Sequence, residues 1–144
     1  AFEEGLKVVN IVDNPSEYAM LQNNLGNALQ YVSSSHRIEN GYRALEAYEE
    51  ALRVRTSIDT PAEYANTISN QANCYSNLPD NPEDTDAGNS KNLQQAIRLY
   101  REARSIFNKI GDMQKVEAVS GALTEIETEA FGSAQPLRDV NKLN

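Results

Sequence analysis

Few side chains in this 144-residue chain have the type and spacing that catalysis requires. The single histidine, His36, follows three serines, and a serine beside a histidine can act as a nucleophile beside its base. Such a pair also needs a third group that orients the histidine, and the polar segment 33–37 supplies none. Paired carboxylates such as Glu49-Glu50 fall on exposed helix turns, where nothing forms a pocket around them. We therefore predict a loop histidine and no enzymatic activity.

The single cysteine and one acidic segment are the other candidates for chemistry. Cys74 has no second cysteine to pair with, which fits a reducing compartment, and we expect a buried, unreactive thiol. The acidic segment 80–86 suggests a calcium loop. An EF-hand loop that began at Asp84 would need glycine at its sixth position and glutamate at its twelfth, but Asn89 and Gln95 stand there. We expect a solvated loop, with no metal and no cofactor.

The charge balance excludes some classes of partner. Lys and Arg total 13 against 21 Asp and Glu, a formal net charge of −8. A nucleic-acid-binding surface needs basic residues that displace counterions, so no nucleic-acid partner is expected. No apolar run reaches the ~18 residues of a membrane span, so no membrane partner is expected either. With 40% hydrophobic residues the chain can form a core, and we predict a cytoplasmic location.

An internal repeat organises the elements that must position any site. Residues 6–31 match residues 52–77 at an offset of 46, and residues 44–51 match residues 96–103 at an offset of 52. Six residues inserted between positions 78 and 91 account for the difference between the two offsets. The positions identical at the first offset are Leu6/Leu52, Val8/Val54, Asp13/Asp59, Pro15/Pro61, Glu17/Glu63, Tyr18/Tyr64, Ala19/Ala65, Asn24/Asn70 and Asn27/Asn73.

Each repeat predicts two helices. Asn14 and Thr60 are expected N-caps, each followed by proline at the first helical position and glutamate at the third, which is the pattern of a capping box. Apolar residues at helical spacing predict helices at 15–31, 42–58, 61–78, 91–110 and 113–131. No alternating strand pattern occurs. The predicted fold is all-α, built from antiparallel helix hairpins that stack on one another.

Small residues predict where helices approach closely. Gly26 and Ala72 occupy equivalent positions in the middle of a helix, where glycine costs ~1 kcal/mol relative to alanine. Alanines on the second helix of each repeat flank a single large side chain, Tyr48 or Tyr100. We expect Gly26 and Ala72 to be buried at contacts between helices.

These motifs resemble the tetratricopeptide repeat. The segment 24–29, which reads Asn-Leu-Gly-Asn-Ala-Leu, is followed by Ala44-x₃-Tyr48-x₂-Ala51, and residues 70–75 and 96–103 repeat the arrangement. The period of 46 or 52 exceeds the usual 34 residues and resembles the kinesin-light-chain-like branch of the family. The resemblance implies a superhelical α-solenoid over residues 1–131. Within it we expect a partial helix at 1–12, repeats at 13–58 and 59–110, a terminal helix at 113–131, and a flexible tail at 132–144.

The resemblance also implies a binding face. In tetratricopeptide arrays the first helix of each repeat lines the concave surface, and here those helices are rich in amides. An asparagine side chain offers both a donor and an acceptor to an extended peptide, although the same residues could instead join neighbouring helices. The predicted peptide-binding residues are Asn23, Asn27, Asn66, Asn70 and Asn73.

The functional hypothesis is a protein-interaction scaffold that holds a neutral or basic peptide or partner segment in this groove. The alternative is a regulatory or sensor segment of a larger bacterial signalling protein or enzyme, whose catalytic domain lies outside this chain. Self-association through the N-terminal end is a third option. The parent reading frame would separate the first two hypotheses.

Overall fold

The structure, a computed structural model, describes residues 9–130 and is all-α. Within this range there is no β-strand, only an isolated bridge between Asn81 and Asp84. The prediction of an all-α fold is confirmed. The helices are α2 (Pro15–Tyr31), α3 (Arg37–Leu52), α4 (Pro61–Ser76), the short 3₁₀ helix η1 (Thr85–Ala87), α5 (Ser90–Ile110) and α6 (Met113–Ala130).

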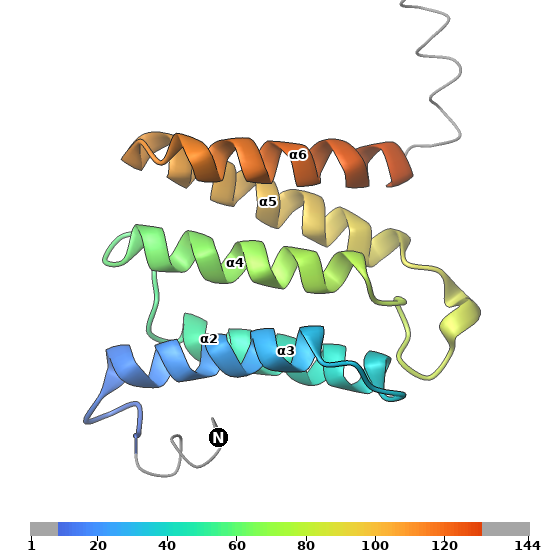
Figure 1. Cartoon of the computed structure of the whole chain (residues 1–144), viewed down its shortest axis with the longest axis horizontal. Helices are drawn as coiled ribbons and strands as arrows, with labels where there is room; N and C mark the ends of the chain where they lie inside the picture. Colours follow the sequence, from blue (N-terminus) through green and yellow to red (C-terminus); the bar gives the residue numbers. More distant parts are fainter. Residues whose placement is uncertain (1–8, 131–144) are drawn as a thin grey trace, which may run out of the picture.

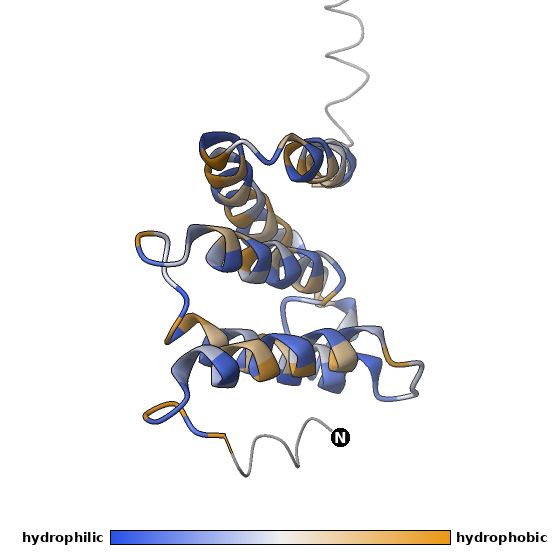
Figure 2. Ribbon diagram, turned by 60° about the vertical axis from the view of Figure 1, so that its left-hand side comes forward, coloured by the Kyte–Doolittle hydropathy of each residue, from blue (hydrophilic) through white to orange (hydrophobic). Residues whose placement is uncertain are grey.

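Consecutive α-helices run in opposite directions and each packs on the next in the sequence (Figure 1). The pair α2 and α3 lies at one end of the molecule, α4 and α5 occupy the middle, and α6 lies at the other end. The buried apolar residues form clusters between the helices, and hydrophobic and hydrophilic residues alternate along each helix (Figure 2). None of the helices in the described range is both long enough and apolar enough to cross a membrane.

Four helices begin and end close to their predicted limits, but α3 does not. It spans Arg37–Leu52 rather than 42–58. Its early start places Gly41 inside the helix, where a Cβ atom would come within 2.5 Å of Leu78, so glycine allows that side chain to pack. At the other end the amides of Arg53 and Val54 bond three residues back, to Glu50 and Ala51, which tightens and ends the helix.

A turn follows α3 in which threonine hydroxyls accept hydrogen bonds from backbone amides. This turn explains why the helix does not continue to residue 58. The Thr60 hydroxyl accepts a hydrogen bond from the Thr56 amide at 2.9 Å, and the Thr56 hydroxyl accepts one from the Asp59 amide at 3.0 Å. Asn10 forms the equivalent turn before α2, where its side-chain oxygen accepts from the amides of Val12 and Asp13. Side-chain bonds of this kind compete with helix formation.

Two further predictions need correction, the partial helix at residues 1–12 and the capping boxes at the starts of α2 and α4. Residues 9–12 are not helical, so the partial helix predicted at 1–12 is wrong where it can be compared. Residues 1–8, residue 131 and the predicted tail at 132–144 lie outside the described residues. Asn14 and Thr60 are N-caps, each followed by proline, but neither side chain makes a capping hydrogen bond, so the capping boxes are not formed. Thr60 instead uses its hydroxyl in the preceding turn.

The small residues are buried where helices meet, as predicted. Gly26 of α2 faces Tyr48 of α3, and a Cβ atom at Gly26 would come within 2.5 Å of the tyrosine ring. Tyr48 is fully buried. Ala72 is also fully buried and belongs to a core cluster that includes Tyr100. In the first repeat the aromatic ring thus packs directly against the small residue, and in the second the equivalent pair lies in one buried cluster.

A tyrosine on the first helix of each repeat is bonded to a glutamate on the second. The Tyr18 hydroxyl donates to Glu50 at 2.5 Å, and the Tyr64 hydroxyl donates to Glu102 at 2.7 Å. Tyr18 and Tyr64 are 46 residues apart, and Glu50 and Glu102 are 52 apart. Since these are the two offsets found in the sequence, the repeat is preserved in three-dimensional contacts as well as in residue type.

The inserted segment joins α4 to α5 and is anchored by Asp80. Both carboxylate oxygens of Asp80 accept hydrogen bonds from the first amides of α5, at 3.1 Å from Lys91 and 2.8 Å from Asn92. A carboxylate at this position satisfies amides that have no partner within the helix and interacts favourably with its dipole. Asp80 is thus a helix cap supplied by the loop, and the sequence pattern gave no indication of it.

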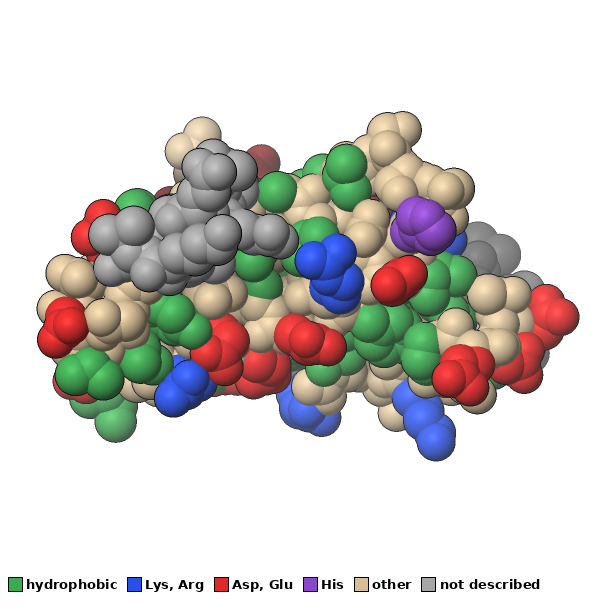
Figure 3. Space-filling view, turned by 90° about the horizontal axis from the view of Figure 1, so that it is seen from below, with side chains coloured by type: hydrophobic (Ala, Val, Ile, Leu, Met, Phe, Trp, Pro, Cys, Tyr) green, Lys and Arg blue, Asp and Glu red, His purple; other side chains and the backbone are tan. Residues whose placement is uncertain are grey.

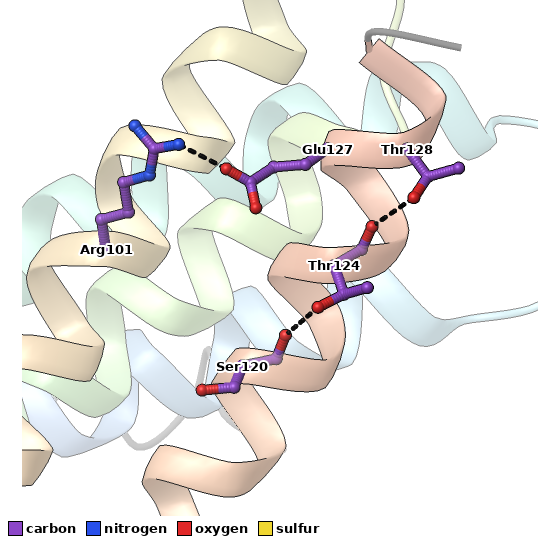
Figure 4. Close-up of polar contacts among 5 residues, drawn as sticks. All are labelled: Arg101, Ser120, Thr124, Glu127 and Thr128. Atoms are coloured by element: carbon purple, nitrogen blue, oxygen red, sulfur yellow. Dashed lines mark hydrogen bonds and ion pairs between the residues drawn. The ribbon is translucent and has the colours of Figure 1, made fainter. Parts of the chain in front are cut away.

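The outward side of α6 is polar, unlike the equivalent side of α4. Positions 68 and 72 of α4 hold buried Ile68 and Ala72, whereas the residues 52 positions later are Ser120 and Thr124. The Thr124 hydroxyl donates to the Ser120 carbonyl, and Thr128 donates to the Thr124 carbonyl (Figure 4). Glu127, by contrast, lies towards α5 and pairs with Arg101 of that helix.

Candidate functional site

A groove of about 260 Å³ lies where the end of α2 meets α4 and α6. Three of the five predicted site residues line it, all from α4: Asn66, Asn70 and Asn73. They occur at helical spacing and therefore share one face of the helix. Tyr31, Tyr100 and Lys115 complete the parts of the wall used below. The groove is the candidate site.

Asn23 does not line the groove and is buried within the scaffold. Its side-chain oxygen accepts hydrogen bonds from the Thr67 hydroxyl at 3.1 Å and from the Asn70 side-chain amide at 3.2 Å. Both donors belong to α4, so Asn23 joins α2 to α4. Thr67 is itself fully buried and accepts from Arg55.

Asn27 also lies outside the groove and bonds within the scaffold. Its side-chain oxygen accepts from the buried Tyr48 hydroxyl at 2.6 Å, and Gln30 donates to the same hydroxyl at 2.8 Å. Burial raises the pKa of Tyr48 well above its ordinary value. A tyrosine hydroxyl deep between helices needs such partners, because an unsatisfied polar group there is costly.

Asn70 and Asn73 each use the side-chain nitrogen in hydrogen bonds within the fold and leave the side-chain oxygen unused. The amide nitrogen of Asn70 donates to Asn23, and that of Asn73 donates to Gln30 and, at 3.1 Å, to the Tyr31 hydroxyl. Within residues 9–130 neither side-chain oxygen accepts a hydrogen bond from the protein. These two oxygens are acceptors available at the groove.

Asn66 and Ser69 have the greatest unused capacity. Asn66 makes no side-chain hydrogen bond to any part of the chain that the structure describes. The Ser69 hydroxyl is buried and has no partner in the same range. Lys115 of α6 is exposed, and its ammonium forms no ion pair with a described residue. The wall between α4 and α6 thus combines amide, hydroxyl and ammonium groups that are not used by the fold.

Aromatic residues at the groove were missed by the sequence analysis. Tyr31, at the end of α2, keeps 67% of its surface exposed, while Tyr100 of α5 is buried beneath the groove. Burial raises the pKa of Tyr100 to about 12, so its hydroxyl stays protonated near neutral pH. Tyr31 was recognisable only as the last residue of a helix, and Ser69 had no distinguishing signal.

The other candidates for chemistry do not form a site. His36 is the N-cap residue of α3 and is exposed, as Figure 3 shows, with its nearest acidic oxygen, on Glu39, at 3.9 Å. Cys74 is 1% exposed and donates to the Gly41 carbonyl at 3.2 Å. Burial raises the thiol's pKa to about 12. Within residues 9–130 no group of three or more acidic, cysteine or histidine side chains is arranged to hold a metal ion.

The geometry therefore provides a groove in which amide, hydroxyl and ammonium groups lie beside aromatic and aliphatic side chains, which include Phe107, Ala118, Val119 and Ala122. Asn66, Asn70 and Asn73 are brought together. Asn23 bonds to Asn70, whereas Asn27 bonds to Tyr48, whose hydroxyl also accepts from Gln30, the partner of Asn73. Comparison of the chain with protein-family models, with curated proteins and with solved structures gives no match.

Proposed function

We propose that this chain is a protein-interaction module of the tetratricopeptide type, whose helix hairpins stack as a superhelical solenoid and hold an extended peptide in the groove beside α4. The repeated tyrosine-to-glutamate bonds support the assignment to this type of repeat, as does the close approach of the Tyr48 ring to Gly26. A cytoplasmic location suits the buried, unpaired thiol of Cys74.

The observation that carries the proposal is the unused hydrogen-bonding capacity along one wall. Asn66, Asn70 and Asn73 recur along α4, and each presents at least an amide oxygen that the fold does not use. An extended peptide has backbone amides that need such acceptors, and Asn66 also offers a donor for its carbonyls. The groove would therefore bind a main chain with little dependence on its side chains.

The scaffold would fix these amides in place before a ligand arrives. Asn23 holds Asn70 by one end of its side chain, and Gln30 holds Asn73 in the same way. Restricting side chains before binding reduces the entropy that binding would otherwise remove. Asn23 and Asn27 thus contribute to the site as supports behind it, and Asn66, Asn70 and Asn73 as contacts.

Charge favours a neutral or basic ligand. The net charge of −8 would attract cationic segments, and among the groove residues Lys115 is the sole basic side chain. Affinity would be modest, because each neutral hydrogen bond contributes only ~0.5–1.5 kcal/mol net.

The test is a peptide-array screen with the chain, followed by titration of each ligand found. Asn66→Leu is the most informative variant, since Asn66 makes no bond that the fold needs and a leucine would both remove the amide and narrow the groove. We expect it to weaken binding by about tenfold or more. Asn108→Leu, at an exposed position of α5 that does not line the groove, is the matched control and should bind normally.

Two results would contradict the proposal. One is equal affinity of Asn66→Leu and the parent chain for every peptide found. The other is binding that maps, by chemical-shift changes, to residues outside the walls formed by α4 and α6.

A further inference from the structure

The repeat is not preserved in the polar residues that join one first helix to the next. Where α2 meets α4, the Asn23 oxygen accepts hydrogen bonds from the Thr67 hydroxyl and the Asn70 amide. The equivalent residues where α4 and α6 line the groove, found 46 or 52 positions later, are Ser69, Val119 and Ala122. Valine and alanine side chains form no hydrogen bonds, so the polar network of the first junction cannot form at the second.

This change leaves the Ser69 hydroxyl without a partner. The hydroxyl is buried and makes no hydrogen bond to any residue that the structure describes, and Ser69 lines the groove. Native proteins satisfy most of their buried polar groups, because an unsatisfied one costs free energy. A ligand that bonds to Ser69 would therefore recover free energy that the fold alone does not.

The Tyr100 hydroxyl is a second unpaired group at the same groove. Its equivalent 52 positions earlier, Tyr48, donates to Asn27 at 2.6 Å and accepts from Gln30 at 2.8 Å. Tyr100 lines the groove and is 6% exposed, yet its hydroxyl makes no hydrogen bond within residues 9–130. Asn73, the equivalent of Asn27, donates to Gln30 instead. Two primary amides thus satisfy this tyrosine in the first repeat, and the described chain supplies neither in the second.

The size of the groove suits one inserted side chain. Its volume of about 260 Å³ is below the ~300–1,000 Å³ of pockets that hold drug-sized ligands. Phe107, Val119 and Ala122 are among its lining residues and offer apolar contact to the methylene groups of such a side chain. A peptide that lies along α4 could therefore place one side chain against Ser69 and Tyr100.

The unused groups favour a primary amide over a charged side chain. A hydroxyl can donate and accept, whereas the unused oxygens of Asn70 and Asn73 only accept. An amide side chain matches both kinds of group, because its oxygen accepts and its nitrogen donates. A carboxylate has no hydrogen to donate to the asparagine oxygens, and an ammonium cannot accept from the hydroxyls.

Nearby charge also bears on the choice between an amide and a carboxylate. Burial, and then Tyr31 and Glu125, raise the pKa of Tyr100. A carboxylate bound beside Tyr100 would thus lie near the negative charge of Glu125. Lys115 at the groove would attract a carboxylate, so glutamate is the competitor that a test must include.

We propose that Ser69 and Tyr100 form an amide subsite, which binds the side chain of a glutamine or asparagine in the bound peptide. The inference rests on the proposed function, since the main chain must lie along α4 for this side chain to reach the two hydroxyls. The subsite gives the groove a sequence preference at one position of a peptide that is otherwise held by its main chain.

The experiment uses four fluorescently labelled peptides of about nine residues, blocked at both ends, which contain lysine near each end and alanine elsewhere. They differ only at the central residue, which is glutamine, asparagine, methionine or glutamate. Methionine resembles glutamine in its unbranched shape but has no amide. In fluorescence anisotropy with the full chain, the better of the two amide peptides should bind at least about tenfold more tightly than the methionine and glutamate peptides.

A double variant tests whether the two hydroxyls cause this preference. Ser69→Ala/Tyr100→Phe removes only the hydroxyls, and its melting temperature should not fall because the described fold does not use them. It should bind the methionine peptide like the parent chain but prefer the amide peptide by less than about threefold. Ser105→Ala/Tyr64→Phe removes the same two groups at positions that do not line the groove, and it should keep the full preference.

Several results would overturn the amide subsite. They are equal affinity for the four peptides, tightest binding of the glutamate peptide, an amide preference that survives in Ser69→Ala/Tyr100→Phe, and no binding at about 1 mM chain. The groove proposal is judged separately by Asn66→Leu. Equal affinities that Asn66→Leu weakens would remove the subsite and leave the groove, whereas binding that Asn66→Leu does not change would count against the groove itself.

Discussion

At the scale of single residues, the missing side chain of Gly26 determines how closely α2 approaches α3. The ring of Tyr48 fills the space that a Cβ atom would need, and the tyrosine cannot swing away because its hydroxyl is held by Asn27 and Gln30. Gly121 of α6 offers the opposite case, with nothing within 4 Å of the same position. Two helical glycines therefore differ only in their surroundings.

Gly26→Ala and Gly121→Ala should consequently change stability in opposite directions. Alanine raises helix propensity by ~1 kcal/mol at either site, but at Gly26 the clash with Tyr48 should outweigh it and lower the free energy of unfolding by ~1–3 kcal/mol. Gly121→Ala should be stabilising by up to ~1 kcal/mol. Urea denaturation of both variants is the measurement, and a Gly26→Ala variant as stable as its counterpart would refute the close contact.

Cys74 should make the fold sensitive to alkaline pH. Its pKa is 9.0 when unperturbed and about 12 in the folded chain because of burial. The folded state thus favours the neutral thiol, and this contribution is complete below pH 9 and lost as the pH rises towards 12. Between these values the parent chain should lose more stability than Cys74→Ala, in which the buried tyrosines still titrate. Urea midpoints across that range provide the comparison, and parallel curves would contradict it.

At the scale of elements, amide side chains divide into those that join helices and those that face the groove. Asn23 bonds to Thr67 and Asn70 of the neighbouring first helix, whereas Asn66 bonds to nothing in the described chain. Both positions looked equivalent in the sequence, as asparagines on one helical face. The difference arises because Asn23 lies against Thr67 and Asn70 of α4, whereas Asn66 faces the groove beside α6.

Asn23→Ala and Asn66→Ala should therefore lower the free energy of unfolding by different amounts. Removing Asn23 leaves the buried Thr67 hydroxyl and the Asn70 amide without their acceptor, which should cost ~1–3 kcal/mol. Asn66→Ala should stay within ~0.5 kcal/mol of the parent chain, as partly exposed substitutions usually do. Thermal or urea unfolding of the pair decides the matter, and equal losses would mean that Asn66 has a structural partner.

The sequence predicted the elements well where a local signal marks them. Pro15 and Pro61 mark the starts of α2 and α4, and Gly111, in a left-handed conformation, marks the end of α5. The end of α3 was mispredicted because the apolar pattern continues through Val54 and Ile58 although the backbone turns. What stops the helix there is a pair of threonine hydroxyls, and their bonding depends on geometry that residue types alone do not reveal.

The candidate site was only partly predictable for the same reason. Helical spacing correctly grouped Asn66, Asn70 and Asn73 on one face. Whether an asparagine on such a face is covered depends on the next helix, and burial of Asn23 follows from the position of α4, 44 residues later in the chain at Thr67. Long-range packing decides which side-chain amides keep unused hydrogen-bonding groups, and the residue types at these positions do not reveal it.

At the scale of the whole molecule, the core consists of two clusters rather than one. The larger joins α4, α5 and α6 around Phe107 and Leu123, and the smaller joins α3 to Cys74 and Leu78. Tyr75 packs against both. Within the described residues α2 buries only Ala19, Asn23 and Gly26, none of them a large apolar side chain.

Native-state hydrogen exchange should reveal a gradient of stability along the chain. Amides of α2 should exchange faster than those of α4 and α5, because local opening of α2 exposes little apolar surface. The helix α5, which buries Leu93, Ile97, Leu99, Tyr100 and Phe107 among others, should exchange most slowly. Exchange measured by mass spectrometry or NMR tests the order, and uniform protection of all helices would show a single cooperative unit instead.

The polar side of α6 also has a consequence for protein engineering. A hairpin grafted after this helix would have to pack on Ser120 and Thr124, where α4 presents Ile68 and Ala72 to its own partner. Exchanging the two polar residues for the pair found 52 positions earlier would recreate the receiving surface, and a copy of α5 would supply the complementary one. The sequence of the central hairpin, α4 and α5, can therefore serve as the template for designing a longer synthetic version of this chain.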